Sequence, residues 1–557
     1  MNRYIIILSF LFFVSIFNNL YSQDEISLFG YDIKKIPYNY LNPTNLSVTF
    51  PLFLYPNYYR YYPINTSNGD VLNIYLNSTV PLHIYIFDVK NFHNFRDGIS
   101  YYSYYENYTN YIHKSISLPS GEYYLVIYND NPVIAYYYFY YFQSNKSIDD
   151  IYLPIGVSDF GVYFNGQQYL GYTYKTTLVV GKVYMKKFNA SVDPICSYSS
   201  LYNDAGSVQL NAVLEIDTYD GPQYYWLQNV LAINNSGGYY YIINNIWNMS
   251  RVKSILNNNS IIGEGAVYFY NRTDSFYYAY ATETYDTNYP INLYLIISVY
   301  QDNLYPKIKF GYSFDGKNII WYDNVTLLIP STNSYIIVEP NLTTSGHLKD
   351  LELIIGGPGE SSCIDVKDID AYLGLYFLYN EKGKYFLSPI PYAFNFGLDT
   401  AETATNAITI LDNGKIQLLV GKSYPNYLGE VKEFYYKINI YYKFNDTYIE
   451  YKVLPYDIIN LIFPNITFYN GREYYLDNIK VNGKIYYTNN ITLLADKDYN
   501  IILNYIPIFY IKINYIGPNF YEIYNITQGS FFKFTVNSTI YQSDNLRWKL
   551  SSIFVNG

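Results

Sequence analysis

Two acidic pairs are the residues of this chain whose types and spacing could carry out hydrolysis. Asp350-x-Glu352 lies next to an apolar run and a glycine-rich turn, and Asp399-x-x-Glu402 lies among small residues. Two carboxyl groups held close together cannot both ionise easily, so one stays protonated as an acid while the other acts as a base. Such a pair can activate water in an acidic medium, and glycines beside it would let a substrate backbone approach closely.

Other catalytic chemistries find little support in the sequence. A Ser-His-Asp triad would have to use His347, and no Gly-x-Ser-x-Gly segment supplies its serine. The Gly356–Gly359 segment lacks the Gly-Lys-Ser/Thr of a phosphate loop, which favours a tight turn between strands. The histidines are too few and too scattered for a His-Glu-x-x-His zinc site: they are His83, His93, His113 and His347. We therefore expect no metal and no cofactor.

The elements that must position these acids are β-strands. Alternation of apolar and polar side chains, as over Phe434–Phe444, is typical of a strand with one buried face, and Asn-Gly or Asp-Gly pairs separate such runs. Amphipathic helices are scarce. The sequence therefore predicts an all-β chain of several antiparallel β-sandwiches. In the first acidic pair, alternation places Asp350 and Glu352 on one face of a strand.

Changes along the chain suggest four β regions after a leader. We expect an accessory β-sandwich at 24–148, a long central domain at 149–428, a β module at 429–509, and a β module at 510–557. Either this last module is abbreviated or the sequence is incomplete. The central region holds both acidic pairs and most of the glycine clusters.

The first residues are typical of a signal peptide. Arg3 precedes an apolar run from Tyr4 to Phe17, and cleavage is expected after Ser22. The run is too short to span a membrane comfortably, so we expect a mature chain that is secreted or held at the cell surface without a membrane span. About 17 Asn-x-Ser/Thr sequences spread along the chain agree with export as a glycoprotein.

The only cysteines are Cys196 and Cys363, too few for a disulfide scaffold or a four-cysteine zinc site. In an oxidising exterior the two could form a disulfide, and two buried thiols are the alternative.

The polar surface contains few charges. Only 15% of the 557 residues are charged, the net charge is −10, and 79 residues are tyrosine. Hydroxyl and amide groups do not titrate near pH 4, so such a surface suits an acidic medium, although an AT-rich genome would produce a similar composition. The lack of a basic excess gives no indication of nucleic-acid binding.

Eight short segments follow one another between about residues 150 and 428: Pro154–Gly161, Gln209–Leu214, Tyr225–Val230, Asn245–Trp247, Gly263–Gly265, Trp321–Thr326, Asp350–Gly357 and Gly397–Glu402. Together they resemble the thermopsin family of secreted archaeal acid peptidases. The resemblance implies an endopeptidase of the aspartic type that acts on proteins or peptides at acid pH. The acids within the matching segments are Asp323, Asp350, Glu352, Asp399 and Glu402; Asp159 also lies in one, but family members need not have an acid there.

The N-terminal region resembles the pre-peptidase-type β modules of secreted peptidases around Leu118–Ile127. This resemblance implies an accessory role, and exposed aromatic rings there and in the C-terminal modules could contact glycans or the cell envelope. The alternative is that the tyrosines only form strands and core.

Our mechanistic hypothesis takes one carboxylate from Asp350 or Glu352 and one from Asp399 or Glu402, facing each other across a cleft with a water between them. Glu352 and Glu402 are the first pair to test. A non-catalytic surface or envelope protein that kept the thermopsin fold is the main rival. A glycoside hydrolase, which also uses two carboxyl groups, is a more distant alternative.

Overall fold

The structure is a computed structural model, and its contacts divide into two compact units, one of Ser27–Phe434 and one that includes Tyr435–Gly557. Each unit is described by itself. The residues that the structure describes are 27–47, 52–66, 70–133, 135–144, 152–166, 169–194, 204–251, 253–271, 274–345, 347–398, 400–423, 425–515, 520–528, 530–535, 539–543, 546–550 and 553. The predicted signal peptide therefore lies outside them.

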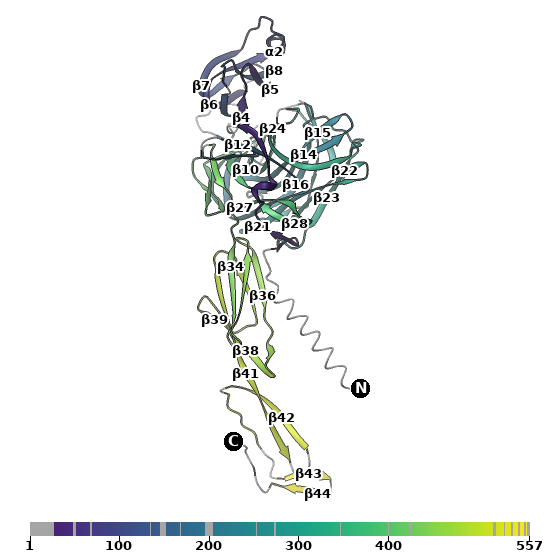
Figure 1. The fold of residues 1–557 in the computed structure, drawn as a ribbon, viewed down its shortest axis with the longest axis vertical. Coiled ribbons are helices and arrows are strands. Elements are labelled where there is room, and N and C mark those ends of the chain that lie inside the picture. Colours follow the sequence, from purple (N-terminus) through teal and green to yellow (C-terminus); the bar gives the residue numbers. More distant parts are fainter. Residues whose placement is uncertain are drawn as a thin grey trace. The chain divides into compact units, whose positions relative to one another are not determined.

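Two large sheets form a β-sandwich in the first unit (Figure 1). The main path of the 15-stranded sheet is β18 (Ala266–Tyr270), β19 (Ser275–Ala281), β16 (Tyr239–Asn248), β15 (Gly221–Asn234), β14 (Ala205–Thr218), β26 (Leu351–Gly356), β10 (Ile155–Asp159), β29 (Tyr392–Phe396) and β33 (Tyr427–Glu430). Beside this path lie β3 (Asn42–Ser47), β11 (Val162–Phe164), β12 (Tyr169–Thr176), β20 (Tyr285–Asp286), β24 (Asn333–Leu342) and β25 (Leu348–Lys349).

The 12-stranded sheet forms the other layer. Its main path is β1 (Ser27–Leu28), β2 (Tyr31–Ile33), β28 (Lys384–Pro389), β27 (Cys363–Glu381), β13 (Leu178–Val192), β21 (Ile291–Asp302), β22 (Tyr305–Ser313), β23 (Ile320–Leu327) and β17 (Ile261–Ile262). Strands β30 (Thr403–Thr405), β31 (Ala407–Asp412) and β32 (Lys415–Val420) extend it beside β27.

The core of the sandwich is the apolar layer between these sheets. Leu210 of β14 and Leu353 of β26 belong to one buried cluster with Val183 and Leu295 of the other sheet. The two layers meet so closely at Gly181 that an added Cβ would lie 2.8 Å from Leu353 Cδ1. Because side chains alternate along a strand, the residues next to Leu210 and Leu353 point to the opposite, outer face of the 15-stranded sheet.

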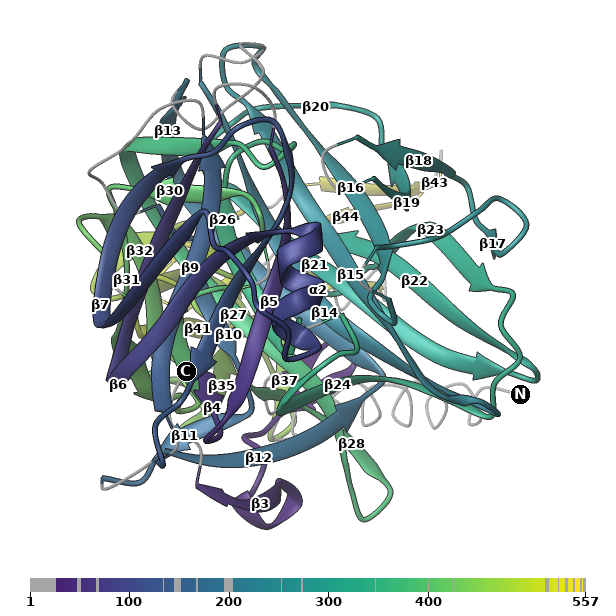
Figure 2. The same cartoon turned by 90° about the horizontal axis from the view of Figure 1, so that it is seen from above.

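Residues 52–144 form a six-stranded sheet that folds over on itself. Strand β6 (Val71–Asp88) pairs with β9 (Ala135–Ser144) along its first half and with β8 (Gly121–Asn129) along its second. Tyr62 can therefore pack on Phe139, with ring centroids 5.0 Å apart. The other elements are β4 (Leu52–Leu54), β5 (Tyr58–Thr66), β7 (Tyr105–Ser117) and the helix α2 (Val89–Arg96), which lies beside β5 in Figures 1 and 2. A 3-10 turn, η1 (Tyr38–Tyr40), precedes them.

The six-stranded sheet shares a hydrophobic cluster with the edge of the sandwich. Leu125 and Tyr137 lie in that cluster together with Phe160, which directly follows β10, and Phe396, which is the last residue of β29. Residues on the two sides of the boundary that we expected near residue 148 therefore pack against each other. The division into separate domains stays a prediction.

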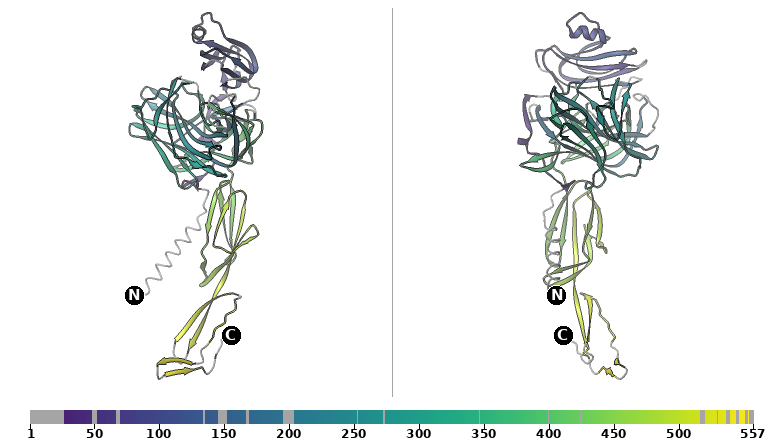
Figure 3. Two further views of the ribbon diagram at one scale, coloured as in Figure 1. Left: turned by 180° about the vertical axis from the view of Figure 1, so that it is seen from behind. Right: turned by 90° about the vertical axis from the view of Figure 1, so that its right-hand side faces the viewer.

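The second unit has its own core, which includes Ile440, Ile479 and Leu503. Figure 3 shows its long strands. They form a seven-stranded sheet of β34 (Tyr436–Tyr442), β35 (Thr447–Val453), β37 (Ile466–Tyr469), β38 (Arg472–Val481), β39 (Lys484–Tyr486), β41 (Tyr499–Tyr515) and β42 (Phe520–Thr527), together with the pairs β36 (Ile458–Ile462) with β40 (Asn490–Leu494) and β43 (Thr539–Ser543) with β44 (Leu546–Lys549).

The all-β prediction is confirmed. Nearly all pairs among the described strands are antiparallel, and the parallel exceptions among them are β2–β28, β27–β30 and β34–β41. The alternating run at Phe434–Phe444 contains β34, whose Ile438 and Ile440 are buried as predicted. None of the helices in the described part of the chain is long and apolar enough to cross a membrane.

Candidate active site

Glu352 is the second residue of β26, and none of its surface is exposed. Its Oε1 accepts a hydrogen bond from the Leu398 backbone N–H at 2.8 Å. Its Oε2 accepts hydrogen bonds from Thr400 Oγ1 and Asn211 Nδ2, both at 3.3 Å. A Cβ at position 397 would lie 2.7 Å from Oε1, so the glycine there is what lets this backbone cover the carboxyl group.

Strand register places a row of polar side chains beside Glu352 on the outer face of the sheet. Glu352 pairs with Asn211 of β14, Asn211 pairs with Gln228 of β15, and Gln228 pairs with Asn245 of β16. Gln228 Nε2 donates to Asn211 Oδ1 at 3.3 Å, and Trp247 Nε1 donates to Gln228 Oε1 at 3.2 Å. A chain of hydrogen bonds thus runs from an indole to the glutamate.

A second branch leaves Gln228 along β14. Its Nε2 also donates to Gln209 Oε1 at 3.0 Å, and Gln209 Nε2 donates to Ser207 Oγ at 3.0 Å. Ser207 Oγ then donates to the Gly357 carbonyl at 2.7 Å. This branch ends on the turn that follows β26.

That turn also holds Glu402, because the Ser361 N–H donates to Glu402 Oε1 at 2.9 Å. A Cβ on Gly356 would lie 2.8 Å from Glu402 Cβ. Gly356 and Glu352 share a face of β26, so Glu402 lies over the same face as Glu352. Four residues of strand separate their levels, about 13 Å at the usual rise. Each glutamate thus has its own donor, and their action as a pair stays a prediction.

Aromatic rings border the polar row on its far side. Trp247 stacks on Tyr277 with ring centroids 4.4 Å apart and meets the edge of Tyr270 at 5.6 Å. Tyr270 reaches the turn after β26, where its hydroxyl lies 2.8 Å from Ser361 Oγ. Tyr270 lies in β18 and Tyr277 in β19, and Figure 2 shows these two strands beside β16, which carries Trp247. The hairpin and the turn therefore enclose the amide row between the two glutamates.

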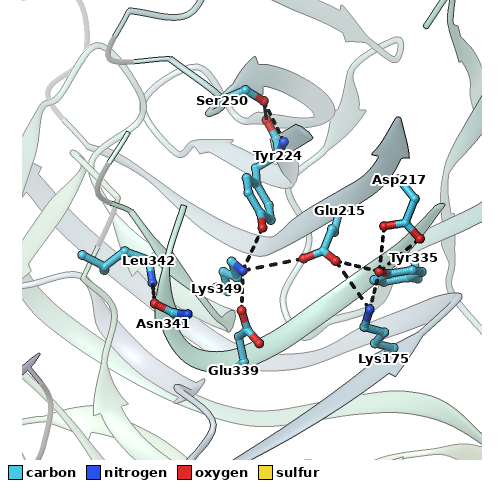
Figure 4. Close-up of polar contacts among 10 residues, drawn as sticks. All are labelled: Lys175, Glu215, Asp217, Tyr224, Ser250, Tyr335, Glu339, Asn341, Leu342 and Lys349. Carbon is cyan, nitrogen blue, oxygen red and sulfur yellow. Dashed lines mark hydrogen bonds and ion pairs between the residues drawn. The ribbon is translucent and has the colours of Figure 1, made fainter. Parts of the chain in front are cut away.

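A buried ion network lies farther along the same face (Figure 4). Lys349 Nζ contacts Glu339, lies 3.0 Å from the Tyr224 hydroxyl, and is 3.6 Å from Glu215 Oε2. The Tyr335 hydroxyl donates to Glu215 Oε1 at 2.6 Å. No sequence pattern pointed to this network, because its members come from separate strands.

Asp350 does not belong to β26, which begins at Leu351. It is fully buried, and its charge helps to raise the pKa of Tyr174, after burial and together with Asp159. Asp350 directly precedes the strand that carries Glu352, and the expectation that the two acids share one strand face stays a prediction.

Asp159 and Asp323 are buried anchors in the described structure. Asp159 accepts hydrogen bonds from the hydroxyls of Tyr172 at 2.5 Å and Tyr174 at 3.0 Å, and from the Gly161 N–H at 2.9 Å. Burial nevertheless raises the pKa of Asp159 to about 6.

Asp323 joins β23 of one sheet to β16 and β19 of the other. Its Oδ2 accepts from Asn244 Nδ2 and from the Tyr278 hydroxyl, both at 2.8 Å, and its Oδ1 accepts from the Glu264 N–H at 3.0 Å. These donors come from strands of the facing sheet and from the Gly263–Gly265 segment, so Asp323 can be explained by its role in holding the layers together.

Asp399 and Cys196 lie outside the described residues. The neighbours of Asp399 in the chain are Leu398 and Thr400, which both donate to Glu352. Cys363 is buried and disulfide-bonded, and its pairing with Cys196 stays a prediction.

His347 contacts Ser345 Oγ through Nδ1 at 2.8 Å, and burial lowers its pKa to about 4. Within the described ranges no cluster of three or more His, Cys, Asp or Glu side chains could hold a metal ion.

Sequence reasoning missed the amides of this site. Asn211, Gln228 and Trp247 lie in segments that carried the resemblance, but only their acidic neighbours were considered for chemistry. The available signal was the alternation Ser207-x-Gln209-x-Asn211 in an otherwise apolar strand, which places three neutral polar side chains on one face.

Comparison with known proteins agrees with the predicted resemblance. A family model described as thermopsin matches residues 134–407. Thermopsin of Sulfolobus acidocaldarius is 30% identical over 277 residues, which cover 47% of this chain and 77% of that protein. The matched region contains Glu352, Glu402 and the amide row.

Proposed function

Because the chain belongs to the thermopsin family, and so to a family of peptidases, we propose that it is a secreted endopeptidase that hydrolyses proteins at acid pH. The observation that supports this most is the arrangement at Glu352. Its carboxyl group lies on the non-core face of the sheet, is held by three hydrogen-bond donors, and has an amide row beside it. A group held in one orientation can act as a base.

In the proposed reaction Glu352 accepts a proton from a water molecule as the water oxygen bonds to the peptide carbonyl carbon. A second carboxyl group, protonated in acid, donates its proton to the carbonyl oxygen. When the tetrahedral intermediate collapses, the C–N bond breaks and the leaving nitrogen takes the proton held by Glu352. Both carboxyl groups then have their starting protonation states once the second recovers its proton from the hydroxyl group.

The second carboxyl group comes from the segment that covers Glu352. Glu402 lies over the same strand face, and Asp399 is flanked by the two residues of that segment that donate to Glu352. Because Glu352 is fully covered, substrate access requires this segment to move. Lid movements of this kind are common in enzymes.

The test measures cleavage of a denatured protein between pH 2 and 7 by the full chain and by Glu352→Gln, Glu402→Gln and Asp399→Asn. Loss of a general base or acid costs about 10²- to 10⁴-fold in rate. We expect that loss for Glu352→Gln and for one of the other two variants, with unchanged melting temperatures.

Wild-type rates in a folded Glu352→Gln variant would reject the mechanism. If the folded wild-type chain cleaved nothing at any acidic pH, with or without pepstatin, the non-catalytic surface protein would be favoured. The amino-terminal residue of the exported protein tests secretion, with cleavage expected after Ser22.

A further inference from the structure

We infer that Trp247 is a positioning residue: through Gln228, its indole N–H sets the direction of the Asn211 amide so that Asn211 donates to Glu352. This inference rests on the proposed role of Glu352 as the base. It adds to that role the groups that keep the carboxyl group in its accepting state.

The indole determines which end of each amide in the row donates and which accepts, because the indole N–H can only donate. Trp247 Nε1 lies 3.2 Å from Gln228 Oε1, so the carbonyl end of the Gln228 amide must face the indole. Its NH₂ end then faces the other way, toward β14. Reversing this amide would bring an NH₂ group against the indole N–H.

The next amide follows from the first. The Gln228 NH₂ group donates to Asn211 Oδ1, so the NH₂ group of Asn211 must point away, toward Glu352 Oε2 and Thr400 Oγ1. An amide whose oxygen and nitrogen could otherwise be exchanged thus has one satisfied orientation. Asn211 would present a carbonyl oxygen to Glu352 if the row were reversed.

Burial makes this direction matter. Asn211 is 0% exposed and Gln228 9% exposed, so water has little access to replace a lost partner. A buried amide that loses its partner costs free energy, and this penalty holds the row in one direction.

The same indole also directs the second branch. Gln228 donates to Gln209, whose NH₂ group donates to Ser207, and Ser207 donates to the Gly357 carbonyl. The turn that Gly357 begins carries Ser361, the donor to Glu402. One group therefore lies upstream of both glutamates.

The consequence for catalysis concerns the charge state of Glu352. Donors stabilise an ionised carboxylate, the form that can take a proton from water. The three donors described above are neutral groups; the acid Asp350 lies two residues before Glu352, and Asp399 follows the donor Leu398 in the chain. If Asn211 turned its carbonyl toward Glu352, the protonated and inactive form would be favoured.

The test compares Trp247→Phe with Trp321→Phe. Phenylalanine at position 247 keeps a ring against Tyr277 but removes the N–H. Trp321 lies in β23 of the other sheet, so Trp321→Phe is the same substitution made away from the amide row. For Trp247→Phe we expect kcat to fall about tenfold, as for a weakened catalytic hydrogen bond, with KM changed less than about twofold.

The pH profile supplies a readout that a purely structural role would not move. The acid limb of kcat should shift to higher pH by about 0.5 to 1 unit in Trp247→Phe, the equivalent of losing about one hydrogen bond to the carboxylate. The Trp321→Phe profile should match that of the wild type.

A double variant tests whether the indole acts through Gln228. Gln228→Met keeps the side-chain length but removes the amide, and Trp247→Phe should have little further effect on kcat in that background. Additive effects, or a Trp247→Phe pH profile equal to the wild type's, would overturn the inference while leaving the proposed function intact. Full activity of Glu352→Gln would instead reject the proposed role of Glu352 as the base, and absence of cleavage by the folded wild-type chain would reject the proposed function.

Discussion

At the scale of single residues, the chain contains a carboxyl group whose titration favours folding in acid. Burial raises the pKa of Asp159 to about 6, above the ordinary value of 3.8. An acid whose pKa is higher in the folded state binds more protons folded than unfolded between those values. Its contribution to stability is therefore complete below about pH 4 and is lost as the pH rises through about 6.

Asp159→Asn should remove this dependence. The difference of about two pKa units corresponds to about 3 kcal/mol between pH 3 and pH 7, an order-of-magnitude figure. We expect the substitution to destabilise the protein at pH 3, where the carboxyl group is neutral, and to cost less or even stabilise it at pH 7. Urea unfolding at the two pH values measures the change. An equal effect at both pH values would contradict the prediction.

Gly397 gives a second prediction at this scale. Gly397→Ala places a methyl group 2.7 Å from Glu352 Oε1 and forces the carboxyl group or the covering segment to move. Overpacking of this kind costs about 1 to 3 kcal/mol, and we expect proteolysis to fall at least about tenfold because the base is displaced. Gly383→Ala is a control with open space around the added Cβ and a backbone φ of 88° that itself disfavours alanine; it should lower stability but not the rate of the folded enzyme.

At the scale of elements, the β18–β19 hairpin is joined to the turn after β26 by Tyr270 and Ser361. Tyr270→Phe removes that hydrogen bond and keeps the ring. We expect faster amide hydrogen exchange in residues 359–362, because a local tether has been lost, while global stability changes by only about 1 kcal/mol. Tyr268→Phe in the same strand is the matched control, since the Tyr268 ring is half exposed. Unchanged exchange in Tyr270→Phe would show that the hairpin does not restrain the turn.

Strand periodicity in the sequence was enough to predict which face of a strand a side chain occupies. The alternation around Leu351 and Leu353 correctly placed Glu352 opposite the core, and the all-β class follows from many such runs. The meeting of Asn211, Gln228 and Trp247 depends on how three strands pair, and alternation within one strand does not determine its partner or register. Amides also do not titrate, so a search of the sequence for titratable groups finds the acids and not the amides.

At the scale of the whole molecule, the residues proposed for catalysis all belong to the unit of Ser27–Phe434. The other unit has a core of its own that includes Ile440, Ile479 and Leu503. We therefore expect a chain ending at Phe434 to keep kcat on a denatured protein within about twofold, as expected for a compact unit with its own core. A folded truncated chain without activity would show that residues beyond 434 contribute to the site.

The family resemblance from separate short segments is confirmed by the match over residues 134–407. Composition alone left acid adaptation and genome bias equally open, because both enrich tyrosine and asparagine. What composition could not provide was the location of buried acids such as Asp159, whose shifted pKa depends on packing rather than on abundance.

Trp247, whose indole lies between Tyr277 and the amide row, also gives the protein an intrinsic fluorescence probe at the candidate site. The chain has only four tryptophans, and Trp247 is hydrogen-bonded to Gln228 within the candidate site. Changes in polarity or protonation near that ring would alter its emission, and Trp321 in the other sheet provides an internal reference. Substrate binding and titration at the glutamates could thus be followed by intrinsic fluorescence, with no label attached.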